Sequence, residues 1–217
     1  MTLFSGHKND IRAGDFSDLD STSRGRNDND MMNIENCKID NLKAKLLLHS
    51  CCAPCLTAVN GKIDADFDIS ILWYNPNIEP LEEHNKRLSV LQNFADETAI
   101  QLNNYKYDYR EENDKWHEAI AGFENEPEGG KRCEKCIEFR LQRTKELSEK
   151  YDLFTTTLSV SPHKNAKFIN EFGKKLSPKY LKSDFKKENG YLRSIELSKE
   201  YELYRQNYCG CLYSTKY

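Results

Sequence analysis

Apolar residues gather in short runs, separated by polar turns, from about residue 45 onward. Four of these runs are too short for helices and end at turn residues, as buried strands do. They cover residues 45–50, 68–74, 105–109 and 154–158, and the third alternates only weakly between apolar and polar positions. The pattern therefore predicts four strands.

Between these strands, apolar residues recur three and four positions apart, which is the spacing of one helix face. Helices are expected from about Leu56, over 81–98 behind Pro80, over 133–147, from Ser161 and Pro162 through Phe172, and from about Tyr191 to Tyr201. Strands that alternate with helices predict an α/β fold, in which a parallel sheet carries helices on both faces.

Polar and cysteine residues follow three of the predicted strands. Cys51, Cys52 and Cys55 come directly after the first strand, Asn75 follows the second, and residues 159–163 follow the fourth. Sites in open parallel sheets lie at the carboxyl ends of the strands. We therefore expect these three segments to converge at one edge of the sheet.

The first 41 residues show no such patterning. Aspartates recur there among Ser, Asn, Gly and Arg, and this composition cannot bury enough apolar surface to offset its ordering entropy. We expect a disordered polar tail at 1–41 and one domain at 42–217. The tail is too acidic for a targeting peptide, and no apolar run approaches the ~20 residues that span a membrane, so we expect a cytoplasmic protein with no membrane partner.

Eight cysteines are present, and seven of them form three tight groups. The groups are Cys51, Cys52 and Cys55, then Cys133 and Cys136, then Cys209 and Cys211. A disulfide framework is not expected without an export signal, because the cytosol keeps thiols reduced. The grouping predicts a metal or redox site, and the isolated Cys37 receives no role.

Two cysteines from the first group and two from the CxxC would make a Cys₄ set, which both zinc and a [4Fe–4S] cluster accept. Adjacent cysteines make a poor zinc knuckle, since successive side chains point apart, so a larger cluster is favoured. Lys131, Arg132 and the start of a helix favour the thiolate form of the CxxC. A zinc-stabilised nucleic-acid-binding module remains an alternative.

A tRNA sulfur-transfer ATPase is a second alternative. Such an enzyme needs a glycine-rich phosphate loop after its first strand. The corresponding loop here, between His49 and Cys55, holds no glycine.

Six segments carry a resemblance to a known family. They are HSCCAPC at 49–55, YNPNI at 74–78, RCEKC at 132–136, FTTTLSVSPHKN at 154–165, KSDFKK at 182–187 and YRQNYCGC at 204–211. In this order they closely resemble the cobalamin-independent epoxyqueuosine reductases, the QueH family. The resemblance covers about Lys43 to the C-terminus and excludes the polar tail.

The resemblance implies a Rossmann-like domain of the adenine-nucleotide-hydrolase type. It implies that this domain reduces epoxyqueuosine in tRNA to queuosine, which is the last step of tRNA queuosine biosynthesis. The sequence does not identify the electron donor. The resemblance implies a [4Fe–4S] cluster bound by four cysteines, namely Cys51, Cys52, Cys133 and Cys136, and a redox-active pair at Cys209 and Cys211. It also implies one additional iron beside the cluster. Cys55 stands where some members have Asp, and this replacement of a carboxylate by a thiol leaves the ligands of that iron open here.

Opening an epoxide to an alkene removes one oxygen and takes two electrons and two protons. Cys209 and Cys211 could supply two electrons by closing a disulfide. An iron held by Cys55 could act as a Lewis acid on the oxygen. The alternative is that Cys209 and Cys211 themselves hold that second iron, with or without Cys55.

The departing oxygen also needs a proton donor, for which His49, His163 and Asp184 are the candidates. Each of them also has a purely structural interpretation. His49 could be a hydrogen-bonded core histidine, His163 a residue in the first turn of a helix, and Asp184 a loop cap.

Basic residues concentrate in the second part of the chain. Residues 131–217 hold 19 Lys and Arg against 11 Asp and Glu, although the whole chain carries a net charge of -3. A solvated surface alone would explain this balance. With a tRNA substrate, the candidate phosphate contacts are Lys164, Lys167, Lys182, Lys186, Lys187 and Arg193.

Overall fold

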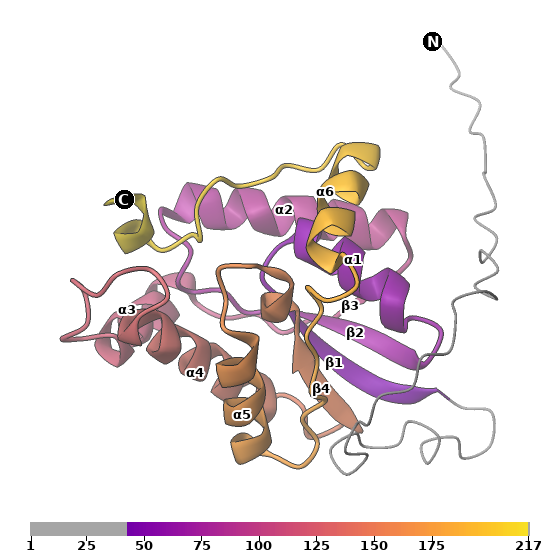
Figure 1. The fold of residues 1–217 in the computed structure, drawn as a ribbon, viewed down its shortest axis with the longest axis horizontal. Coiled ribbons are helices and arrows are strands. Elements are labelled where there is room, and N and C mark those ends of the chain that lie inside the picture. The colour runs from indigo at the N-terminus through magenta and orange to yellow at the C-terminus, as the bar shows by residue number, and fades with distance from the viewer. Residues whose placement is uncertain (1–42, 217) are drawn as a thin grey trace, which may run out of the picture. The chain divides into compact units, whose positions relative to one another are not determined.

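A computed structural model describes residues 43–216, and the predicted polar tail and Cys37 lie outside these residues. Four parallel strands form one sheet in the order β3-β2-β1-β4 (Figure 1). The strands are β1 (Ala44–Ser50), β2 (Phe67–Trp73), β3 (Gln101–Leu102) and β4 (Leu153–Thr156). The predicted α/β fold with a parallel sheet is confirmed.

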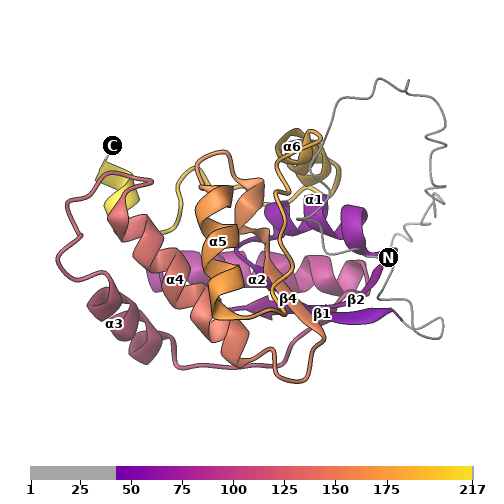
Figure 2. The same ribbon diagram turned by 60° about the horizontal axis from the view of Figure 1, so that its bottom comes forward.

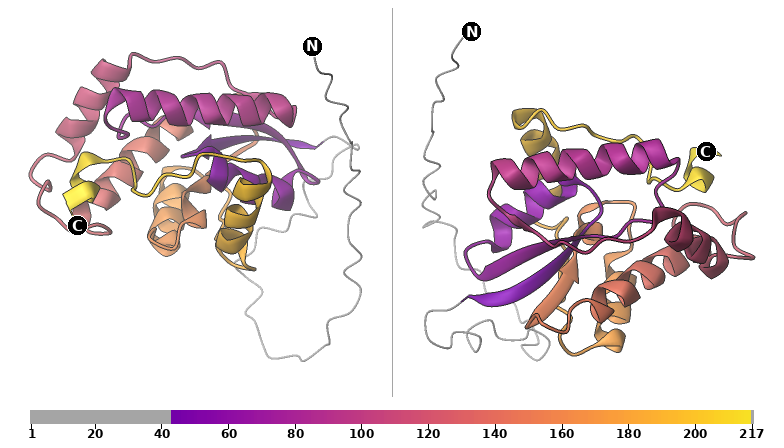
Figure 3. Two further views of the ribbon diagram at one scale, coloured as in Figure 1. Left: turned by 90° about the horizontal axis from the view of Figure 1, so that it is seen from above. Right: turned by 180° about the vertical axis from the view of Figure 1, so that it is seen from behind.

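Helices cover both faces of this sheet (Figures 2 and 3). On one face lie α1 (Ala53–Ile63) and α2 (Leu81–Glu97), with α6 (Gly190–Glu200) packed against α1. On the other face lie α4 (Lys131–Glu146) and α5 (Ala166–Leu176), with α3 (Tyr109–Ala119) beside α4.

The central strand β1 is apolar at successive positions because both of its faces are covered. Leu46 and Leu48 pack into the core under α1 and α2, whereas Leu47 packs into the core under α4 and α5. All three are fully buried. Burial on both faces requires apolar side chains at successive positions, which explains the continuous apolar run in the sequence.

The predicted strand at 105–109 is wrong, and α3 was not predicted. The third strand is the short β3, and Tyr109 begins a helix that Asp108 caps, because the Asp108 carboxylate accepts the Glu111 backbone N–H at 2.9 Å. Tyr107 packs edge-on against Tyr74 and does not join the sheet. The helix is hard to see in the sequence because only Glu112 and Trp116 within it are buried.

Three boundaries also differ from the prediction. Helix α1 begins at Ala53, with Cys52 as its N-cap, so Cys55 lies inside the helix. Strand β4 ends at Thr156, and a 3₁₀ turn, η2 (Thr157–Val160), follows. Helix α5 begins only at Ala166, since the Asn165 side chain accepts the Phe168 N–H at 3.1 Å and caps it there.

The strand order reverses around β1, which pairs with β2 on one side and β4 on the other. A crevice therefore opens at the carboxyl ends of β1 and β4, where ligands bind in open α/β sheets. Cys51 and Thr157 are the residues that leave these two strand ends. No helix in the described part of the chain is long and apolar enough to cross a bilayer.

Candidate functional site

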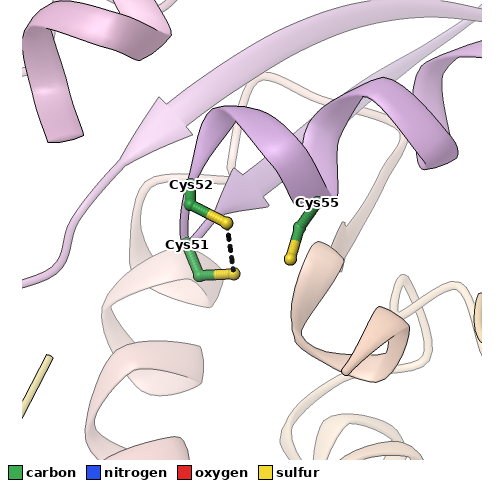
Figure 4. A group of neighbouring side chains, drawn as sticks. All are labelled: Cys51, Cys52 and Cys55. Atoms are coloured by element: carbon green, nitrogen blue, oxygen red, sulfur yellow. Dashed lines mark hydrogen bonds between the residues drawn. The ribbon is translucent and has the colours of Figure 1, made fainter. Parts of the chain in front are cut away.

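The first cysteine group lies where β1 turns into α1 (Figure 4). The sulfurs of Cys51, Cys52 and Cys55 all lie within 4.8 Å of one another, and those of Cys51 and Cys52 are 3.9 Å apart. Cys51 leaves the strand, Cys52 caps the helix and Cys55 lies in its first turn. This backbone course, unlike a regular strand or helix, turns two successive side chains toward a third.

Hydrogen bonds make Cys51 the most acidic thiol of this group. Bonds from the Cys52 and Cys55 thiols hold the pKa of Cys51 well below its usual range, with help from Thr157. The Thr157 hydroxyl donates to the Cys51 sulfur at 3.4 Å and accepts the Cys51 backbone N–H at 3.1 Å. The bond to Cys51 raises the pKa of Cys52 to about 12 and also raises that of Cys55. Cys51 is therefore the first of the three thiols to ionise.

The CxxC lies in the first two turns of α4. The Cys133 sulfur accepts the Gly129 backbone N–H at 3.2 Å. Cys136 is buried in a small cluster with Trp116, Ile120 and Cys211. Burial raises the pKa of Cys136, while the nearby Arg140 and Lys164 charges act in the opposite direction.

The third group is held in place by the loop that precedes α2. The Glu79 N–H donates to the Gly210 carbonyl at 2.8 Å, and Arg87 donates to the Cys209 carbonyl at 3.2 Å. The Tyr208 hydroxyl donates to the Glu79 carbonyl at 2.7 Å. These bonds fix the backbone of the C-terminal pair against the loop.

Cys209 and Cys211 have different surroundings. The Lys164 ammonium donates to the Cys209 sulfur at 2.9 Å. Burial opposes ionisation, but Lys164 and Arg140 together lower the pKa of Cys209. Cys211 lies against Trp116, and burial raises its pKa to about 12.

A cavity of about 460 Å³ opens beside these groups. Cys51, Cys52, Cys55 and Cys209 all line it. Its wall is rich in basic side chains, namely Arg87, Arg140, His163, Lys164 and Arg205, and Glu128 is the acidic residue among its lining residues. The cavity therefore suits an anionic occupant.

Arg140 on α4 lies near cysteines from all three groups. Its side chain is buried, with 2% of the residue exposed. Burial lowers its pKa, but the charges of Cys136, Cys209, Cys51 and Cys133 outweigh burial and raise it. One guanidinium is thus the common electrostatic neighbour of four cysteines from three segments.

The three candidate proton donors lie in different places. His49 is fully buried, its Nε2–H donates to the Tyr74 carbonyl at 3.1 Å, and its Nδ1 accepts from Thr156 at 2.8 Å. Burial and the Arg140 charge lower its pKa to about 4, so His49 is neutral and both ring nitrogens are engaged. His163 is exposed at the cavity wall. Asp184 does not line the cavity, and its buried Oδ1 lacks a hydrogen-bond partner.

The six candidate phosphate contacts differ in their exposure and position. Lys164 points into the cavity toward Cys209, and Lys186 donates to the Lys164 carbonyl at 2.7 Å. The other four are exposed, namely Lys167, Lys182, Lys187 and Arg193. Lys187 lies near the end of α1 that is remote from Cys52, because Lys62 donates to its carbonyl at 2.8 Å.

Sequence reasoning missed Arg140, Trp116 and the inward orientation of Lys164. Arg140 stands one helical turn after Cys136, on the same face of α4, and this spacing was the available signal. Trp116 lies in a stretch without apolar periodicity, so nothing in the sequence pointed to it.

Comparisons with known proteins agree with these motifs. The family described as "Epoxyqueuosine reductase QueH" matches residues 46–217. The epoxyqueuosine reductase QueH of Streptococcus pyogenes serotype M1 is 40% identical over 187 residues, which cover 82% of this chain and 72% of that protein. The QueH of Thermotoga maritima is 40% identical over 176 residues, 78% of this chain and 89% of that protein. This chain therefore belongs to the epoxyqueuosine reductase QueH family.

Proposed function

We propose that this chain reduces the epoxide of epoxyqueuosine in tRNA to the alkene of queuosine. One observation carries the proposal: Arg140 is the shared neighbour of cysteines from three separate segments, beside a basic cavity. Family membership supports the same reaction.

Four cysteines, Cys51, Cys52, Cys133 and Cys136, would hold a [4Fe–4S] cluster, and Cys55 would be left for an additional iron. The surrounding side chains fit such a group. Buried nitrogen donors of Trp116, Arg132 and Arg140 lack full hydrogen bonds. Trp116 interacts with Cys136, Arg132 with Cys211, and Arg140 with both CxxC cysteines.

Buried donors without acceptors are rare in native proteins. Their concentration around the cysteines suits a group rich in anionic sulfur. When bound, a [4Fe–4S] cluster supplies one-electron transfer.

The C-terminal pair can balance the reaction. If Cys209 as a thiolate and Cys211 as a thiol close a disulfide, they release two electrons and one proton, and with a second proton from solvent the epoxide oxygen leaves as water. Lys164 would hold Cys209 in the thiolate form, whereas the apolar neighbours of Cys211 would keep it a thiol. An external donor would then reduce the disulfide for the next turnover.

The tRNA would approach the basic cavity. His163 and Lys167 are exposed on the segment that follows β4, at the carboxyl edge of the sheet. These side chains would contact the phosphates that flank the modified nucleotide, which would enter the cavity.

The test is turnover of tRNA that carries epoxyqueuosine, by anaerobically reconstituted protein with a chemical reductant. Mass spectrometry of the released nucleosides should show loss of one oxygen atom from epoxyqueuosine. The matched control is Cys37→Ser, which changes a cysteine outside the family match and should leave turnover intact. Cluster-loaded protein that leaves the epoxide unchanged would refute the proposal.

A further inference from the structure

Arg140 is a buried cation without a carboxylate partner. None of the ion pairs in the described part of the chain includes it. Moving an unpaired charge out of water is costly, so buried cations normally have an anionic partner. The groups near Arg140 that could supply the missing negative charge are the cysteine sulfurs.

Its hydrogen bonds leave one side of the guanidinium open. Nε donates to the Cys136 carbonyl at 3.2 Å, and Nη1 reaches the Asn75 side-chain oxygen at 3.5 Å. Asn75 is itself fixed by a 2.8 Å bond to the Ser50 carbonyl. Nη2 is buried and has no partner. The side chain is therefore oriented by β1, β2 and α4, with one donor unused.

The other arginines of the cavity wall have partners. Arg87 pairs with Glu83 at 2.7 Å and donates to the Cys209 carbonyl. Arg205 donates to the Ser194 carbonyl and the Ser198 hydroxyl, both at 3.0 Å. Among these three arginines, Arg140 is the one with a buried donor that lacks a partner.

We propose that Arg140 is a positioning residue that donates its Nη2–H to a sulfur of the cysteine-bound iron–sulfur centre and raises the reduction potential of that centre. The inference rests on the proposed function. Reduction adds negative charge to an already anionic centre, and a fixed cation and N–H donor stabilise the reduced form more than the oxidised form. Because a guanidinium stays protonated, this contribution does not change with pH.

The test compares midpoint potentials of the cluster by redox titration with spectroscopic detection. Arg140→Gln should load the same iron and sulfide as wild type, with a midpoint potential shifted to more negative values. Arg140→Lys keeps the positive charge but loses the forked N–H donors of the guanidinium. Its midpoint potential should lie between those of wild type and Arg140→Gln. The matched control is Lys145→Gln, which removes an exposed cation from the last turn of the same helix, far along it from the CxxC, and should leave the potential unchanged.

A wild-type potential in folded, cluster-loaded Arg140→Gln would overturn the inference and leave the proposed function standing. If Arg140→Gln does not fold, Arg140→Lys decides, because a potential equal to that of wild type contradicts the proposed contact and a more negative one supports it. Wild-type protein that takes up no cluster would overturn both proposals.

Discussion

Cys209 and Cys211 are separated by one residue, yet their surroundings differ in charge. Lys164 touches the Cys209 sulfur, whereas Cys211 packs with Trp116 and Ile120. In thiol–disulfide chemistry the thiolate, and not the thiol, is the nucleophile. In the proposed relay, this asymmetry would make Cys209 the more nucleophilic member of the pair and Lys164 the residue that sets its reactivity.

Replacing Lys164 by Met should raise the pKa of Cys209, because the ammonium that stabilises the thiolate is removed. The measurement uses cluster-free protein that also carries Cys211→Ser, with and without Lys164→Met. The pH at which Cys209 alkylation reaches half its maximal rate should be higher in the Lys164→Met protein, as measured by mass spectrometry of the peptide 206–216. Lys167→Met, an exposed change on α5, is the control and should leave the profile in place. An unshifted profile in Lys164→Met would show that Lys164 does not set this pKa.

Cys209→Ser and Cys211→Ser should each abolish turnover and leave the cluster absorbance intact, since neither residue is among the four expected cluster ligands. Iron analysis separates the two roles for this pair. Unchanged iron favours the disulfide relay, and loss of one iron per chain favours ligation of a second iron. Full activity in either variant would contradict both roles.

At the scale of secondary-structure elements, the site depends on how the C-terminal segment docks against the loop before α2. Gly210 has φ +115, and a Cβ there would lie 2.9 Å from Ile78 Cγ1 and 3.1 Å from Arg87 Nη1. Only glycine accepts that backbone conformation without strain and leaves room for the two neighbours.

Gly210→Ala should therefore destabilise the fold by about 1–3 kcal/mol and lower turnover, because the pair flanking it must shift. Chemical denaturation measures the first effect. Gly61→Ala provides the control, since Gly61 lies inside α1 with no atom within 4 Å of the added Cβ, and it should stabilise by about 0.5–1 kcal/mol. Equal stability of Gly210→Ala and wild type would show that the docking is loose.

The elements that were predicted correctly have a clear apolar pattern within their own sequence. Strand β1 is a continuous apolar run, and α2 and α4 repeat apolar residues on one face. The cysteine groups stand out because their members are adjacent or nearly so. Helix α3 escaped prediction because it buries only two residues. The contact between Lys164 and Cys209 joins residues 45 positions apart, and no short-range pattern reports such a pairing.

At the scale of the whole molecule, the basic cavity and the exposed lysines near it suggest electrostatic capture of a polyanion. The chain is net negative, so this attraction comes from an uneven distribution of charge. The exposed lysines do not all lie on the same side, since Lys187 is near the remote end of α1. We therefore place the proposed tRNA-binding surface at the start of α5.

Binding of tRNA should weaken steeply as salt rises, because each phosphate contact releases counterions. Lys167→Gln should reduce the slope of log affinity against log salt by about one. Lys45→Gln removes a cation at the amino end of β1, the opposite edge of the sheet, and should leave the slope unchanged. Salt-insensitive binding, or equal effects of the two changes, would contradict this surface.

We propose that cysteines from β1–α1 and from α4 bind one iron–sulfur centre. The most direct measurement is iron and acid-labile sulfide content, with Mössbauer spectra, of anaerobically reconstituted wild type and of Cys52→Ser, Cys133→Ser and Cys37→Ser. We expect a brown [4Fe–4S] protein for wild type and Cys37→Ser, and loss of the cluster in both other variants. A colourless protein with one zinc, or an intact cluster in Cys133→Ser, would contradict it.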